Sequence, residues 1–365
     1  MLKRVSYSCC LTSSLKPKSL FEWMLFFGGM SLLVGWYHSH APRHAQCPPS
    51  AACSPCPVLS PRSVPPPRAK TRCTKAEAEA IAAQQPIPNS NCPQKTPWIH
   101  ALLAGSFQRP SATLVWIGCN KGDDLLAAAR EWSQNVSYDS HRLRAYWQGL
   151  PDGGRVCAVK DAEFPVDAHR IRPVRGLCVE PMAATIDVVR RAFDVEGWTP
   201  ALEVVHAAVS VVPGEAAFPK ARAGYEALGI GSAAAETEPV RVVTLDELTE
   251  SRGLDAIDML AIDTEGNDVR VLIGGMRTLS RVRYLEFEYH AQNHWGVSSL
   301  EDWVDMLDVY LGFDCFWMGN AGQLWQLTGC WHDSYYERRA WSNVACAHRE
   351  RASELVRAMA EARAQ

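Results

Sequence analysis

Between residues 111 and 290, short apolar runs alternate with segments that have a helical pattern. The apolar runs lie at 111–117, 176–179, 202–212, 257–262 and 282–289. The helical patterns lie at 123–132, 183–193, 244–249 and 268–276. Strands that alternate with helices favour parallel pairing, because each crossover helix returns the chain to the same edge of the sheet. The sequence therefore predicts an α/β fold, a doubly wound and mostly parallel sheet with helices on both faces.

The flanks of this region predict the limits of the domain. Thr74 can cap a short helix over 75–84, and a second short helix is expected at 97–105. The tail 349–365 is rich in Ala, Arg and Glu and is expected to form one exposed helix. We therefore predict a domain over 74–348 with its core at 111–290.

An insertion is predicted inside the core. Roughly sixty residues separate Gly118 from Glu180, where a compact strand–helix–strand unit needs about 20–30. The excess falls in 133–175, which could form a lid, a wall of the acceptor site or plain surface.

The N-terminus predicts a membrane anchor. Residues 1–19 contain Lys3, Arg4, Lys16 and Lys18 and no acid, and residues 20–37 are apolar apart from Glu22. A membrane-spanning helix needs about 20 apolar residues. Positive charge before the span favours a cytoplasmic tail. We expect a single-pass type II signal anchor with the rest of the chain in the Golgi or ER lumen. A cleaved signal peptide and an organelle transit peptide are the alternatives.

Residues 38–73 have the composition of a stem. Nine of the 23 prolines fall within 41–70, and proline-rich chains are extended and semi-rigid. The stem holds Cys47, Cys53, Cys56 and Cys73. The spacing of Cys53 and Cys56 allows a metal site. Disulfides of the stem cysteines, within one chain or between two chains in a linked dimer, are favoured in an oxidising lumen. The net charge of −3 predicts no nucleic-acid partner.

Residues directly after the strands are the candidate site, because doubly wound folds bind ligands at the carboxyl ends of their strands. Gly118, Asn120 and Gly122 form a glycine turn after the first strand, and Glu180 ends the second. An acid there can accept both ribose hydroxyls of a nucleoside. A plain tight turn and a surface carboxylate are the simpler readings of these residues.

Motifs for other cofactors are missing from the sequence. It contains no G-x-G-x-x-G, no Walker lysine motif and no G-x-S-x-G elbow. A nucleoside cofactor without a pyrophosphate remains, and S-adenosylmethionine fits that description.

Several segments together resemble the FkbM family of S-adenosylmethionine-dependent methyltransferases. They are 115–122, 178–181, 206–210, 244–246, 260–266 (LAIDTEG) and 271–275. The resemblance implies a Rossmann-like class I methyltransferase that methylates hydroxyl oxygens, with Pro181 and Ala208 among the cofactor-binding residues. The ending EFEYH and the Trp-rich region after it are similar to a membrane-anchored branch of algae and protists. The acid that the family places at the end of the first strand is Trp116 here, and Asp123 or Asp124 could replace it.

The acceptor side is predicted at the next two strand ends. Methyl transfer to a hydroxyl requires a group that orients or deprotonates it. We expect Asp263 in that role, then Glu265 and His290; a helix cap is the simpler reading of Asp263. His294 is a weaker candidate. No spacing fixes a metal site, although Asp263, Glu288 and His290 could bind a divalent ion.

The last third of the chain is rich in aromatic residues and cysteine. Its tryptophans are expected to form a second small core or a sugar-stacking platform, with Trp295 as a wall of the site. They are Trp295, Trp303, Trp317, Trp325, Trp331 and Trp341. One disulfide is expected among Cys315, Cys330 and Cys346.

The leading hypothesis is therefore a lumenal O-methyltransferase that acts on a glycan or another hydroxylated acceptor. A type II Golgi glycosyltransferase shares the anchor and stem, but no D-x-D motif follows a candidate strand. A binding protein on a degenerate methyltransferase scaffold is the third reading, which Trp116 makes plausible.

Overall fold

The computed structural model describes residues 71–83, 98–99, 101–103, 109–133, 140–147, 173–199, 201–338 and 341–362. All of them belong to the compact unit Pro67–Gln365. The predicted cytoplasmic tail, anchor and nearly all of the stem lie outside the described residues. Within the described part, the helices are too short or too polar to cross a bilayer.

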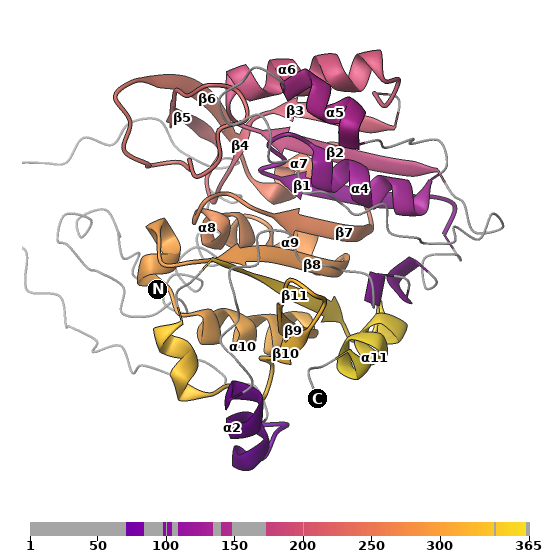
Figure 1. The fold of residues 1–365 in the computed structure, drawn as a ribbon, viewed down its shortest axis with the longest axis vertical. Coiled ribbons are helices and arrows are strands. Elements are labelled where there is room, and N and C mark those ends of the chain that lie inside the picture. Colours follow the sequence, from indigo (N-terminus) through magenta and orange to yellow (C-terminus); the bar gives the residue numbers. More distant parts are fainter. Residues whose placement is uncertain are drawn as a thin grey trace, which may run out of the picture. The chain divides into compact units, whose positions relative to one another are not determined.

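Eight strands in the described part form one sheet (Figure 1), in the order β10-β9-β11-β8-β7-β1-β2-β3. Their bounds are β1 Ala112–Ile117, β2 Val174–Glu180, β3 Leu202–His206, β7 Ile257–Ile262, β8 Val282–Tyr289, β9 Phe313–Met318, β10 Leu324–Gln326 and β11 Ser342–His348. The run from β3 through β1 to β8 is parallel throughout. Strand β11 is antiparallel to both β8 and β9, and β10 is antiparallel to β9.

The parallel part confirms the predicted α/β fold. Strands β1, β7 and β8 are buried along their whole length, as expected for a sheet covered on both faces. Ile117 is aligned with Val179 of β2 and with Ile262 of β7, so three strands end at one level. The chain runs outward from β1 to β3 and then returns to the other side of β1. This reversal creates the crevice in which such sheets bind ligands.

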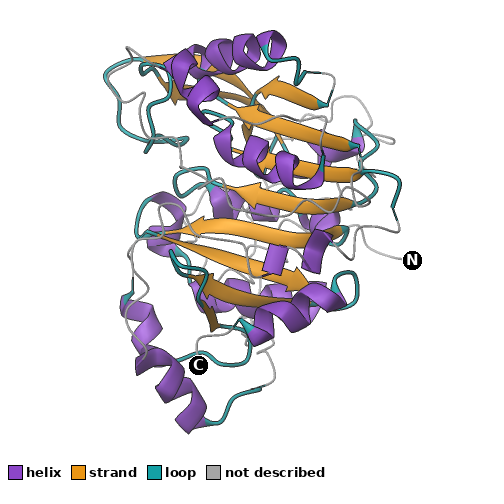
Figure 2. Ribbon diagram, turned by 45° about the vertical axis from the view of Figure 1, so that its right-hand side comes forward, coloured by secondary structure: helices purple, strands orange, loops and turns teal. Residues whose placement is uncertain are grey.

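Helices lie on both faces of the sheet (Figure 2). Helices α4 Asp123–Trp132, α6 Ala183–Val195 and α11 Ser353–Glu361 contribute to the large core on one face. Helix α4 forms because its apolar residues repeat at helical spacing and acids occupy its first turn. Helices α7 Leu245–Glu250, α8 Asp268–Ile273 and α9 Met276–Leu279 pack on one another, and α9 packs against β8. The remaining longer helices are α2 Lys75–Ala83, α5 Ser140–Trp147 and α10 Leu300–Leu311.

Three expectations about the elements were wrong. The run 202–212 is not one strand, because the chain leaves the large sheet after His206 and Ala208–Val209 forms β4 in a second sheet. That sheet has the order β4-β6-β5, with β5 Gly214–Pro219 and β6 Thr237–Val243. The segment 268–276 divides into α8 and α9. The C-terminal helix is amphipathic rather than exposed, since Leu355 and Met359 are fully buried.

The aromatic last third contributes strands to the large sheet. Its strands β9, β10 and β11 extend the large sheet, and Phe316 and Met318 join the same core as the parallel strands. Trp303 and Trp317 are buried side chains of this extension, so core packing is the correct reading for them.

Three disulfides join described residues. Cys315 of β9 is bonded to Cys346 of β11, which agrees with the one bond expected in that region. Cys73 is bonded to Cys330, so this stem cysteine forms a disulfide within the chain. The third joins Cys119 of the glycine turn to Cys178 of β2. Cys47, Cys53 and Cys56 lie outside the described residues.

Candidate active site

The glycine turn lies against the end of β7. Gly118 has φ +80°, and a Cβ on it would lie 1.6 Å from the backbone oxygen of Asp263. Gly122 has φ +78°, and a Cβ there would lie 2.9 Å from the Phe193 ring. Backbone conformation and protein packing therefore require glycine at both positions. The turn is thereby fixed at the point where the strand order reverses.

Glu180 is held at this turn by two backbone groups. The N–H of Asn120 donates to Glu180 Oε2 at 3.0 Å, and the N–H of Met182 donates to Oε1 at 2.9 Å. Glu180 is only 6% exposed. Burial raises its pKa to about 7, although the two backbone hydrogen bonds oppose the shift. Each oxygen keeps a lone pair, so the carboxylate can accept two further hydrogen bonds.

Asn120 offers a second acceptor at the same place. Its Oδ1 is buried and has no hydrogen-bond partner, and its φ is +42°. A buried acceptor without a donor is costly, and a ligand with N–H or O–H groups would satisfy it. Glu180 and Asn120 together offer acceptors to the hydroxyl or ammonium groups of a ligand.

Two other predicted cofactor residues have clear packing roles. The carbonyl of Pro181 is 3.0 Å from His206 Nε2, which fixes the ends of β2 and β3 together. Ala208 is buried in β4 among Met182, Phe218 and neighbouring residues of the small sheet. The side chain of Ala208 therefore packs in the same cluster as Met182, which lies in the turn after β2.

The turn after β7 is organised by a residue that sequence reasoning missed. Asp268 is fully buried, and its carboxylate accepts the N–H of Thr264 at 3.1 Å and of Gly266 at 3.0 Å. Burial raises the pKa of Asp268 to about 6, and these hydrogen bonds oppose the shift. Helix α8 begins at Asp268 with Asn267 as its N-cap residue. The helix-cap reading of Asp263 is therefore wrong, and the carboxylate of Asp263 is left for another role.

Asp263 lies at the end of β7 with an exposed side chain. Its N–H bonds Ile117 O at 2.8 Å, which aligns it with the end of β1. The surrounding protein desolvates the carboxyl, and Glu288, Glu265 and Asp268 add repulsion, so its pKa lies well above the usual range. Because solvent reaches the group, we give the repulsion more weight than the desolvation. Asp263 shares a hydrogen bond with Glu288. It is a basic carboxylate that opens toward solvent.

His290 is buried, whereas Asp263 is exposed. The ring is fully buried, its Nε2 is 3.3 Å from Glu288 Oε2, and its Nδ1 accepts the N–H of Gln292 at 3.0 Å. Burial lowers the pKa of His290, while Asp268 and Glu265 oppose this. A neutral ring with Nδ1 as acceptor carries its proton on Nε2. Neither nitrogen can then take a proton from an acceptor, so this geometry favours a positioning role over the predicted role as a base.

Trp341 is the aromatic side chain that borders this cluster. Its ring centroid is 4.6 Å from that of His290, and its side chain is partly exposed and hydrogen-bonded to Glu288. Trp295, the predicted wall, is instead fully buried and stacks on Phe287 at 5.7 Å. The sequence placed Trp341 only among the six tryptophans of a core or platform, because it lies fifty residues beyond His290 in the chain.

Four further candidates from the sequence are Trp116, Asp123, Asp124 and His294. Trp116 is 4% exposed and belongs to the large core, so its indole does not take the place of a cofactor contact. Asp123 and Asp124 lie in the first turn of α4, directly after the glycine turn. His294 lies 3.5 Å from an Arg270 nitrogen, and burial, followed by Arg270, lowers its pKa.

A segment between β5 and β6 joins the two halves of the site, and no sequence motif indicated it. The carbonyl of Tyr225 accepts from Asn120 Nδ2 at 3.4 Å, and Glu226 forms an ion pair with the buried Lys121. The N–H of Ala227 donates to Glu265 Oε1 at 2.8 Å. Residues 224–229 therefore connect the glycine turn to the turn after β7.

Four non-glycine residues of the described chain have positive φ angles, and all belong to this site. They are Asn120, Ala227, Glu265 and Asn293. Besides the contacts above, Asn293 Nδ2 donates to Glu265 O at 2.6 Å. Such conformations cost about 1–3 kcal/mol each and cluster at functional sites, so the backbone itself supports this location.

Part of the predicted insertion borders the same segment. Trp147 of α5 is fully buried, and its ring would lie 3.0 Å from a Cβ at Gly224. Tyr146 donates to Glu196 at the end of α6. Helix α5 thus anchors residues 224–229 from the side of α6.

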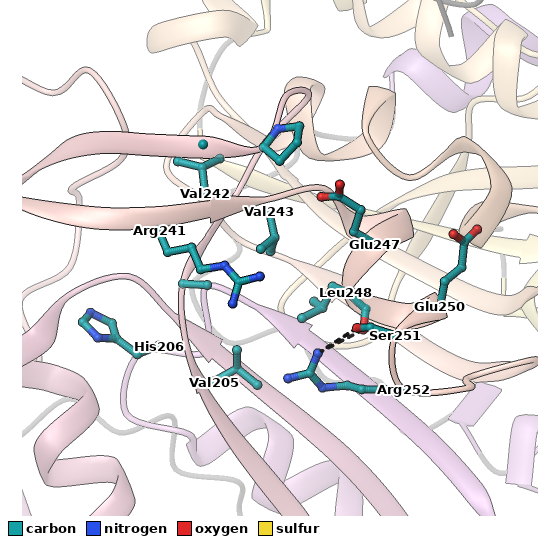
Figure 3. A pocket seen from close by; sticks show the side chains of 13 residues that line it. Val205, His206, Arg241, Val242, Val243, Glu247, Leu248, Glu250, Ser251 and Arg252 are labelled. Atoms are coloured by element: carbon teal, nitrogen blue, oxygen red, sulfur yellow. Dashed lines mark hydrogen bonds between the residues drawn. The ribbon is translucent and has the colours of Figure 1, made fainter. Parts of the chain in front are cut away.

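A separate hollow of about 650 Å³ lies between the β3 edge, β6 and α7 (Figure 3). His206, Arg241 and Glu247 are among its lining residues, but none of the predicted site residues is. Its Arg252 is already bound to Glu203. We place the chemistry at the strand ends, where unsatisfied polar atoms and strained residues gather.

The fold and the site together define a doubly wound protein. Glu180 lies at the end of β2, where an acid can bind the ribose of a nucleoside. Several carboxylates gather at the ends of β7 and β8. Residues 169–315 match the model of the methyltransferase FkbM domain, which supports a methyltransferase. No curated protein matches the chain.

Several solved structures resemble the chain weakly. Cofactor-bound Rv0187 from MTB is 14% identical over 75% of this chain and 89% of its own, with a TM-score of 0.33. A putative O-methyltransferase from Klebsiella pneumoniae is 13% identical over 75% and 87%, with a TM-score of 0.33. An O-methyltransferase from Bacillus cereus in complex with SAH is 12% identical over 76% and 92%, with a TM-score of 0.32. Likenesses at this level carry no argument about function.

Proposed function

We propose that this chain is an S-adenosylmethionine-dependent O-methyltransferase that acts on a hydroxylated acceptor, such as a glycan. The observation that carries the proposal is the pairing of two polar groups across the reversal of strand order. Glu180 and Asn120 lie on the cofactor side, and Asp263 lies on the acceptor side, one strand away. The match of 169–315 to the FkbM domain model supports the same activity.

Each side has a distinct task. The cofactor supplies an electrophilic methyl group on its sulfonium. Glu180 accepts the ribose hydroxyls, and Asn120 Oδ1 accepts from the cofactor's donors. Asp263 orients the acceptor hydroxyl and takes its proton as the oxygen attacks, since raised basicity suits a carboxylate to this role. Glu265, bound by Ala227, holds residues 224–229 over the site.

The cellular setting belongs to the same proposal and rests on residues 1–73. A cytoplasmic tail at 1–19 and an anchor at 20–37 would place the enzyme in the Golgi or ER lumen. The disulfides of the described domain fit an oxidising compartment. Protease treatment of sealed microsomes should leave the domain after residue 74 intact, and its digestion would refute this topology.

Calorimetry with the purified chain separates the proposal from its alternatives. A methyltransferase should bind S-adenosylmethionine and not nucleotide sugars. A type II glycosyltransferase should show the reverse, and a binding protein on this scaffold should bind neither. Binding of a nucleotide sugar alone would overturn the proposal.

Replacing Glu180 with alanine should weaken cofactor binding about 10- to 150-fold. The variant loses hydrogen bonds to a charged acceptor, a total loss of about 1.5–3 kcal/mol. Calorimetry with S-adenosylmethionine measures the change, and thermal unfolding checks that the variant is folded. Unchanged affinity in a folded variant would remove Glu180 from the site.

Cofactor affinity should also depend on pH. The pKa of Glu180 is raised to about 7 in the protein without ligand, and the ribose hydroxyls need the carboxylate form as acceptor. Affinity should therefore fall as pH drops below about 7, approaching tenfold per pH unit. The free energy of unfolding should show the opposite trend. Because the pKa of Glu180 is raised from 4.5 to about 7 in the folded state, the unliganded protein loses stability as the pH rises toward about 7. A Glu180→Gln variant should lose the affinity trend, and a profile identical to wild type would contradict it.

A further inference from the structure

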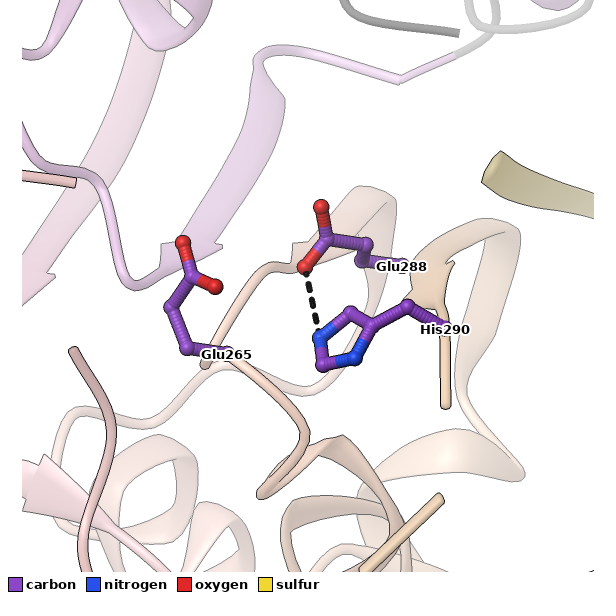
Figure 4. Close-up of side chains that lie close together, drawn as sticks. All are labelled: Glu265, Glu288 and His290. Carbon is purple, nitrogen blue, oxygen red and sulfur yellow. Dashed lines mark ion pairs between the residues drawn. The ribbon is translucent and has the colours of Figure 1, made fainter. Parts of the chain in front are cut away.

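Glu265, Glu288 and His290 come together from two strand ends (Figure 4). One oxygen or nitrogen atom from each lies within 4.8 Å of the others. Asp263 adjoins them through its hydrogen bond with Glu288. Three carboxylates thus converge where the acceptor hydroxyl is proposed to bind.

Two atoms of this cluster lack hydrogen bonds. Glu288 Oε2 and His290 Nε2 face each other at 3.3 Å, yet neither has a hydrogen-bond partner. Glu288 is 9% exposed and His290 is fully buried. Polar atoms this deep are expensive to leave unsatisfied, so Glu288 Oε2 is expected to bind a ligand.

The cluster also lacks a basic side chain. Among the described residues, no Lys or Arg forms an ion pair with Asp263, Glu265, Glu288 or Asp268. Burial raises the pKa values of these four acids most, and the charged groups that act on them are other acids and His290. Close anions in a partly desolvated place need a compensating positive charge.

The chemistry of the donors selects the kind of cation. His290 Nδ1 is occupied by the N–H of Gln292, so Nε2 keeps its proton and is not a ligand, although it lies 3.3 Å from Glu288 Oε2. Because a protonated nitrogen has no lone pair for a cation, the ligand set is made of carboxylate oxygens, which suit hard cations such as Mg²⁺ and Mn²⁺. Those ions retain waters, one of which an acceptor oxygen could replace.

We propose that Asp263, Glu265 and Glu288 bind a divalent cation, Mg²⁺ or Mn²⁺, and that His290 orients Glu288 as its ligand. Binding of the ion depends only on these side chains. Its part in holding the acceptor oxygen rests on the proposed methyl transfer.

The test uses the full chain, stripped with a chelator and dialysed. A titration with Mn²⁺ is monitored by calorimetry and by the electron paramagnetic resonance signal of free Mn²⁺. It should show one saturable site. Glu288→Gln and Glu265→Gln should each weaken binding about 10- to 100-fold. Glu354→Gln, an exposed acid of α11, is the matched control and should bind as wild type does.

Two results would overturn the proposal: no saturable site in wild type, or equal affinity in the folded Glu288→Gln and Glu265→Gln variants. Calorimetry of the metal-free protein with S-adenosylmethionine keeps the proposed function separate. Cofactor binding without Mn²⁺ binding would remove the metal and leave the methyltransferase. In that case the positive sulfonium of the cofactor would compensate the negative charge of the cluster.

Discussion

Asp263→Asn should lower the turnover of methyl transfer by about 10²–10⁴, the usual loss when a positioned acid or base is removed. The substitution keeps the shape of the side chain and removes its charge and basicity. Asp263 is exposed at the end of β7, and its backbone is fixed by Ile117 of β1. Affinity for S-adenosylmethionine should change little, because Glu180 and Asn120 lie at the ends of other strands.

Initial rates at saturating cofactor measure this effect. Asp187→Asn, on the exposed face of α6, is the matched control and should keep full activity. A loss of activity in this variant would not come from a lost helix cap, because Asn267 and Asp268 occupy the positions that begin α8. A soluble Asp263→Asn variant with near-wild-type turnover would end the assignment and direct attention to Glu265.

Asp258→Ala should cost about 3–5 kcal/mol in free energy of unfolding. Asp258 is fully buried in β7 and is bound by Arg109 at 2.7 Å, Arg283 at 3.1 Å and the Thr113 N–H at 2.9 Å. Removing the carboxylate leaves Arg283, itself 9% exposed on its side chain, as a buried charge without its partner. Breaking a buried pair in this way is strongly destabilising.

Denaturant titration followed by circular dichroism measures the loss. The control is Glu203→Ala, which removes the partner of Arg252 in a more exposed pair. That change should cost less than about 1 kcal/mol. Similar losses for both variants would show that the Asp258 cluster does not stabilise β1, β7 and β8 as we infer.

The sequence predicted best those elements whose signal is local. The strands 257–262 and 282–289 and the helix 123–132 have the predicted bounds, because apolar runs and helical spacing are properties of neighbouring residues. It also placed Gly118, Asn120, Glu180 and Asp263 at adjacent strand ends, since parallel strands bring their carboxyl ends to one edge. The antiparallel strands β9 to β11 were missed; β11 pairs with β8 and β9 from a distant segment, whereas β9 and β10 are neighbours in the chain.

Tertiary structure alone decided what each site residue does. Gln292 fixes the proton of His290 on Nε2, and Asp268 takes over the turn that Asp263 seemed to cap. Residues 224–229, Trp341 and the disulfide of Cys119 with Cys178 reach the site from remote parts of the chain. Hydrogen-bond direction, burial and charge repulsion depend on which groups meet in space. A linear pattern can name the strand ends, but it cannot state which groups face each other there.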